Sequence, residues 1–74
     1  METKILIRMA NDIGNFFKSY PNEEQAKKDM ALHIQKFWGR DMRVKIKEYV
    51  TQTSENNSQL ERFVFNAISK YLND

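Results

Sequence analysis

Cysteine is absent from this chain of 74 residues, and histidine occurs once, at His33. Without cysteine there are no disulfides and no thiolate metal sites, and a single histidine cannot pair with a second one around a metal. The two glycines, Gly14 and Gly39, are too far apart to form a glycine-rich phosphate loop. On an apolar helix face, a core-edge histidine is more common than a ligand or base. We therefore expect no enzyme activity, metal or cofactor in this chain.

Long hydrophobic runs are also missing, because no uninterrupted apolar run exceeds three residues. No segment could therefore span a bilayer, and the N-terminus lacks the apolar core of a signal peptide. A cytoplasmic protein with no membrane partner is the expectation. The net charge of +2 is too weak to indicate nucleic-acid binding. A helix-turn-helix is disfavoured too, since the third predicted helix lacks the Asn, Gln and Ser set that reads base edges.

Apolar residues recur at spacings of three and four along most of the chain, which predicts an all-α fold without strands. The expected architecture is one domain over residues 1–74 that consists of a small bundle of four helices. The predicted helices cover residues 3–19, 23–38, 41–51 and 59–72. A flexible polar loop is predicted at residues 51–59, before the last helix. A core of this size supplies only about 3–5 kcal/mol of net stability.

Helix boundaries can be predicted from local capping signals. Pro21 ends the first helix, and Asn22 with Gln25 fits a capping box at the start of the second. Gly39 is expected to close the second helix in a left-handed conformation. Asp41 is the predicted cap of the third helix.

The first helix carries two apolar rows, which together cover more than half of its circumference. The first row consists of Ile5, Met9, Ile13, Phe16 and Tyr20. The second row consists of Ile7, Ala10, Gly14 and Phe17. Two accounts of the second row remain open. It either packs tightly against another helix of the same domain, or it forms an interface with a partner protein.

Basic residues concentrate in residues 36–47, which contain five basic residues and only one acidic residue. This cluster is either a solvated helix face or a docking surface for an acidic or phosphate group. The adjacent Trp38 either fills the core or anchors a partner, since Trp and Arg dominate interface hot spots. The candidate partner-binding residues are Phe37, Trp38, Arg40, Met42, Arg43 and Lys47.

Two segments of the chain, RMANDIGNFF (8–17) and HIQKFWGRDMR (33–43), resemble the delta subunit of cytoplasmic NAD-dependent formate dehydrogenases. The spacing between the motifs agrees with that family, and the similarity covers roughly residues 4–50. One departure follows the tryptophan. Arg40 and Asp41 replace the family's Pro-Arg pair, whereas Met42 and Arg43 match.

The resemblance implies a non-catalytic accessory subunit that supports the assembly, cofactor maturation or stability of its enzyme. Its expected partner is the large catalytic subunit, which carries a molybdenum or tungsten pterin and iron–sulfur clusters, with flavin in another subunit. A maturation chaperone is a further partner that the resemblance allows. A more specific hypothesis places Arg43 on the phosphates of the pterin cofactor. The alternative function is a stand-alone helical adaptor or regulator without a redox role, self-associating through the second row of the first helix.

Overall fold

The computed structural model describes residues 1–73, and it consists of four α-helices and one short 3₁₀-helix. The α-helices are α1 (Thr3–Phe17), α2 (Glu23–Phe37), α3 (Arg40–Gln52) and α4 (Arg62–Tyr71). The 3₁₀-helix spans Glu55–Asn57. Residues 1–73 contain no strand, so the predicted all-α class is confirmed.

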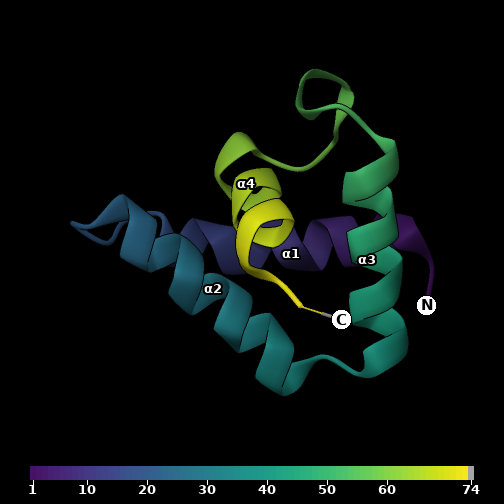
Figure 1. The fold of residues 1–74 in the computed structure, drawn as a ribbon, viewed down its shortest axis with the longest axis horizontal. Coiled ribbons are helices and arrows are strands. Elements are labelled where there is room, and N and C mark those ends of the chain that lie inside the picture. The colour runs from purple at the N-terminus through teal and green to yellow at the C-terminus, as the bar shows by residue number, and fades with distance from the viewer. Residues whose placement is uncertain (74) are drawn as a thin grey trace.

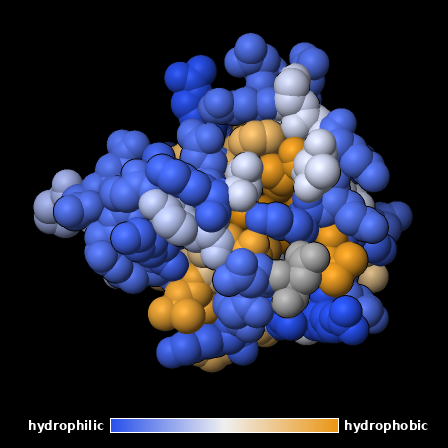
Figure 2. Space-filling model, viewed as in Figure 1, coloured by the Kyte–Doolittle hydropathy of each residue, from blue (hydrophilic) through white to orange (hydrophobic). Residues whose placement is uncertain are grey.

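Helix α4 occupies the centre of the molecule and is seen almost end-on in Figure 1, between α2 and α3 and in front of α1. Its most extensive packing is against α2. All four helices contribute to one core, which also includes Trp38 and Leu60 from the connections. Hydrophilic residues cover most of the face shown in Figure 2, and apolar residues appear between the helices.

The connection between α1 and α2 follows the local signals closely. Helix α1 ends at Phe17, two residues earlier than predicted, and α2 begins at Glu23. The Oδ1 atom of Asn22 accepts a hydrogen bond of 2.9 Å from the backbone N–H of Gln25. The predicted Asn22 cap is therefore confirmed. The Gln25 side chain does not complete the box, because it donates to Asp29 instead.

The predicted conformation of Gly39 is wrong. Trp38 and Gly39 are both extended, with φ of −89° and −66°, and no residue in the described part of the chain has a positive φ. Two extended residues in succession redirect the chain, so a left-handed residue is not needed. Gly39 itself precedes the first residue of α3, Arg40, and the predicted cap at Asp41 is wrong as well.

The segment before α4 is more structured than the predicted loop. Helix α3 continues to Gln52, the 3₁₀-helix follows, and α4 begins at Arg62 rather than at residue 59. Asn11 of α1 holds this segment from a distance. Its Oδ1 accepts from the N–H of Glu61 (2.9 Å), and its Nδ2 donates to the carbonyl of Gln59 (3.1 Å). The start of α4 is thus fixed by a tertiary contact, which local capping rules cannot predict.

The second row of α1 belongs to the core. Ile7, Ala10 and Gly14 are buried, and Phe17 is partly buried. A Cβ added at Gly14 would lie 2.2 Å from Cγ2 of Val64, so α1 and α4 approach closely because this residue is glycine. Of the two accounts of this row, tight packing within the domain is the one found. The proposed partner interface at Ile7, Ala10, Gly14 and Phe17 therefore has little exposed surface in the folded chain.

Candidate docking surface

Two consecutive aromatic residues at the end of α2 have opposite environments. Trp38 is 5% exposed and belongs to the core, whereas Phe37 is 72% exposed. The chain becomes extended at Trp38, so this side chain leaves the helical register and turns inward. Of the two predicted aromatic anchors, only Phe37 lies at the surface.

Arg43 caps the C-terminal end of α2. Its Nη1 donates to the carbonyl of Trp38 at 2.6 Å and to that of Gln35 at 3.5 Å. The last carbonyls of a helix have no partner within the helix and form the negative end of its dipole, so a cation is favourable there. The Nε of Arg43 is buried and has no hydrogen-bond partner among the described residues. The hydrogen bonds of this guanidinium are therefore made within the fold.

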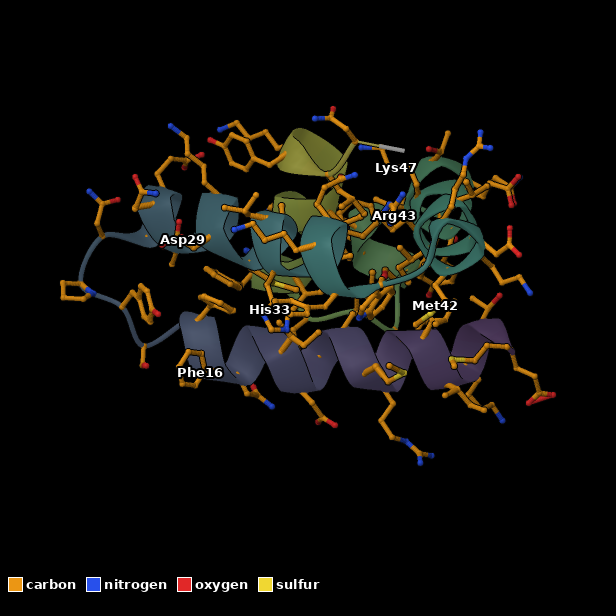
Figure 3. All side chains as sticks on the ribbon, turned by 90° about the horizontal axis from the view of Figure 1, so that it is seen from below. Phe16, Asp29, His33, Met42, Arg43 and Lys47 are labelled. Carbon is orange, nitrogen blue, oxygen red and sulfur yellow. The ribbon has the colours of Figure 1, made fainter. Side chains whose placement is uncertain are left out.

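Lys47 performs the same task for α4. Its Nζ donates to the carbonyls of Ile68 (3.0 Å), Ser69 (3.2 Å) and Leu72 (2.8 Å). The four-residue spacing of Arg43 and Lys47 on α3 thus places two cations at the C-terminal ends of two other helices. Figure 3 shows both on the side of α3 away from α1.

The other two residues of the predicted set lie elsewhere. Arg40 is exposed at the first position of α3. Met42 is partly buried against the core, and Figure 3 shows it on the side of α3 toward α1. The structure therefore does not bring the six predicted residues together on one surface. Phe37 and Arg40 are exposed, and the other four are largely engaged within the chain.

A surface that the sequence did not single out lies between α1 and α2. We call it the aromatic seam, and its residues are Ile13, Phe16, Phe17, Tyr20, His33 and Phe37. The ring centroid of Phe17 lies 5.1 Å from that of Phe16 and 6.0 Å from that of His33. The His33 ring in turn lies 4.8 Å from Phe37, so the rings form a continuous series across the two helices. Phe16 is 65% exposed, which leaves a large ring in contact with solvent.

The aromatic seam contains a hollow of about 170 Å³, lined by Ile13, Phe16, Phe17 and His33. For comparison, an apolar cavity of roughly 150 Å³ can hold a benzene molecule. The hollow is therefore large enough for one aromatic or branched apolar side chain. Figure 3 shows His33 between α1 and α2, and Phe16 at the C-terminal end of α1.

The sequence contained a signal for the aromatic seam. Its residues Ile13 and Phe16 of α1, and Tyr20 just after α1, belong to the first apolar row, which the over-wide apolar surface of the first predicted helix had already marked as unusual. Periodicity could not decide which of the two rows faces the interior. The partner surface was consequently assigned to the row that packs inside.

Comparison with known families adds an independent observation. The chain matches the family of NADH-dependent formate dehydrogenase delta subunits, FdsD, over residues 5–68. The chain belongs to this family. The match extends beyond residues 4–50, the range of the motif resemblance, and includes most of α4. No curated protein and no solved structure matches the sequence.

The two delta-subunit motifs have structural explanations in this fold. In the first motif, Asn11 fixes the start of α4 and Gly14 permits the close approach of α1 and α4. In the second motif, Trp38 enters the core and Arg43 caps α2 through the Trp38 carbonyl. Phe16 and Phe37 belong to the same motifs but are exposed, so the fold does not explain why large aromatic rings stand there.

Near its other end, α2 is tied to α4 by a polar cluster. The Glu24 carboxylate accepts hydrogen bonds from Tyr71 and from Lys70, the latter at 3.0 Å. These bonds lower the pKa of Glu24, the Tyr71 bond being the larger cause. The bond to Glu24 raises the pKa of Tyr71, and it raises that of Lys70 as well. The cluster joins two helices of the same chain and lies outside the aromatic seam.

Charged groups border the aromatic seam on both helices. Lys36 and Arg40 are exposed near Phe37, and neither forms an ion pair within residues 1–73. Asp12 is exposed on α1, one turn before Phe16. Asp29 lies one turn before His33 and accepts a hydrogen bond from Gln25.

Residues 1–73 contain no group of three or more His, Cys, Asp or Glu side chains placed to hold a metal ion. None of the helices in this range has the length and apolar character needed to cross a membrane.

Proposed function

We propose that this chain is a non-catalytic accessory subunit of a cytoplasmic NADH-dependent formate dehydrogenase. It docks on the large catalytic subunit and supports the assembly, cofactor maturation or stability of the enzyme. In this proposal the molybdenum or tungsten pterin, the iron–sulfur clusters and the flavin belong to partner subunits. The observation that carries the proposal is the family match, which spans residues 5–68 of the 74-residue chain.

Surface composition supports a docking role. Large exposed apolar patches on small proteins commonly mark protein interaction sites, and the aromatic seam exposes two phenyl rings, Phe16 and Phe37. Arg40 is also free to contact a partner. Arg43 is bound to the end of α2 through Nη1, so a contact between Arg43 and the phosphates of the pterin would have to use its other N–H groups.

The test is a tagged wild-type chain, expressed in its native cells together with the formate dehydrogenase. We expect the large catalytic subunit to co-purify with the tag. In a strain that lacks this chain, we expect a lower yield of the catalytic subunit or a lower content of metal and pterin per subunit. Recovery of the tagged chain alone, from cells shown to contain the dehydrogenase, would contradict the proposal. Recovery as a homo-oligomer would favour the adaptor function instead.

A further inference from the structure

We propose that the aromatic seam is the surface on which the large catalytic subunit docks. The docking element would place one apolar side chain in the hollow of the seam and carboxylates near Lys36 and Arg40. This inference rests on the proposed function, because it names the surface and the chemistry of the contact that the proposed function requires.

Two rings of the aromatic seam are exposed to solvent. Phe16 and Phe37 are 65% and 72% exposed, although the core contains smaller apolar residues that are fully buried, such as Ala10. Aromatic side chains contribute a large share of binding energy when a partner buries them. The contacts through Phe17 and His33 hold the two rings in one continuous surface. A partner protein could therefore bury both rings together on one surface.

The surface of the seam is hollowed. The hollow of about 170 Å³ is lined by residues from both α1 and α2, so its position depends on the packing of the two helices. A hollow of this size accepts a single leucine, methionine or phenylalanine side chain. In the proposed complex the partner element fills this hollow with one apolar side chain, and its neighbouring residues lie over the exposed rings.

Unpaired cations lie toward the end of the seam where α2 finishes. Lys36 follows His33 by three residues, so both lie on the same flank of α2. Arg40 follows the turn after Phe37 and is exposed, and it lines a separate hollow at the start of α3 together with Met1 and Lys45. By contrast, the nearest cation at the other end of the seam, Lys18, already pairs with Glu61 at 3.3 Å. Carboxylates of the partner would thus find unpaired cations at the end where α2 meets α3.

Asp12 limits the charge pattern that a partner can carry. This exposed carboxylate lies on α1 beside Phe16 and has no ion pair within residues 1–73. A second carboxylate opposite Asp12 would be repelled. The docking element should therefore be acidic toward Lys36 and Arg40, and neutral or basic toward Asp12. This asymmetry fixes the direction in which the element lies along the seam.

Photo-crosslinking identifies the occupant of the seam directly. We would replace Phe16 or Phe37 with p-benzoylphenylalanine in the full chain, isolate the complex from native cells after irradiation, and sequence the cross-linked peptides. Both positions should cross-link to a segment of the catalytic subunit that contains apolar residues next to Asp or Glu. Lys4, exposed at the other end of α1 about three turns from Phe16, is the control position and should give no such product. Cross-links between two copies, or to a segment without acidic residues, would overturn the inference.

Charge reversal tests the border separately. The double variant Lys36→Glu/Arg40→Glu should reduce the recovery of the catalytic subunit at least about tenfold, because like charges would then face each other. The double variant Lys4→Glu/Arg8→Glu makes the same change in net charge on the exposed face of α1, and it should change recovery by no more than about twofold. Far-UV circular dichroism would show that both variants remain folded. Equal losses in the two variants would overturn the inference.

The wild-type chain separates the two proposals. If it recovers no catalytic subunit, the proposed function fails, and the inference fails with it. If it recovers the subunit and the seam variants do so equally well, only the inference about the aromatic seam is wrong.

Discussion

The basic residues of α3 form hydrogen bonds within the fold, whereas the largest aromatic residues of the seam remain exposed at its surface. Arg43 and Lys47 have the composition of a docking surface, yet they bind the carbonyls at the ends of α2 and α4. Phe16 and Phe37 have the composition and spacing of core residues, yet they lie mostly in solvent. Residue type alone would have placed Phe16 in the core and Arg43 and Lys47 at the docking surface.

The difference has a physical cause in each region. Each helix leaves about four carbonyls without a partner at its C-terminal end, and a short bundle places these ends close to neighbouring helices. Long cationic side chains are suited to reach them. The aromatic rings are exposed for a different reason, because the core of a short chain has room for only some of its large apolar residues. The remaining rings stay at the surface unless a partner covers them.

The largest effect should separate the neighbours Trp38 and Phe37. Trp38→Ala should lower the free energy of unfolding by about 3–5 kcal/mol, because it leaves a cavity in the core. That loss is comparable to the whole stability expected of such a domain. Phe37→Ala should change the free energy by no more than about 0.5 kcal/mol, because the ring is mostly exposed. Urea unfolding followed by circular dichroism measures both, and similar losses in the two variants would refute the assigned environments.

The next effect should distinguish the capping cations from the exposed one. Arg43→Met and Lys47→Met should each lower the free energy of unfolding by about 1.5–3 kcal/mol, since hydrogen bonds from charged donors to helix ends are lost. Arg40→Met should stay within about 0.5 kcal/mol. The same unfolding assay applies. A destabilised Arg40 variant with unchanged Arg43 and Lys47 variants would reverse the roles given to these residues.

A smaller effect should appear at the contact between α1 and α4. In Gly14→Ala the added methyl group would overlap Cγ2 of Val64, at a cost of about 1–3 kcal/mol. The higher helix propensity of alanine would offset roughly 1 kcal/mol of this. In a Val64→Ala background the extra cost should disappear, which a double-mutant cycle would show. Phe16→Ala, two residues along the same helix, is the surface control. An additive cycle would mean that the two side chains do not compete for the same space.

The smallest effect should be the acid dependence of the Glu24 cluster. The pKa of Glu24 is lowered from its ordinary value of 4.5, so its contribution to stability is present above that pH. The contribution is lost as the pH falls through the lowered value. Glu24→Gln should therefore flatten the decline of the melting temperature between about pH 5 and about pH 3. Recovery of the catalytic subunit should not change, because this cluster lies away from the aromatic seam. An unchanged acid decline would show that other carboxylates dominate it.

Part of the fold could be predicted because its causes are local. The spacing of apolar residues predicted four helices, and Asn22 marked the start of α2 to the residue. Local reasoning failed at Gly39, where an extended turn replaces the expected left-handed residue. It failed again before α4, where the side chain of Asn11 from α1 sets the geometry.

The candidate site was predicted less well, for a related reason. The family motifs and the residues Phe37 and Arg40 were found from the sequence, and both residues are exposed. The sequence could not show that Trp38 turns into the core, or that Arg43 and Lys47 bind helix ends. Those outcomes depend on which backbone atoms lie within reach after the helices pack.

The sequence by itself determined the helices and the apolar faces that they carry, because both follow from a repeat of 3.6 residues along the chain. Only the tertiary structure decided which apolar row of α1 lies inside and which cations remain free. These choices rest on pairs far apart in the chain, such as Gly14 with Val64 and Lys47 with Leu72. The aromatic seam is what remains exposed once those pairs have formed.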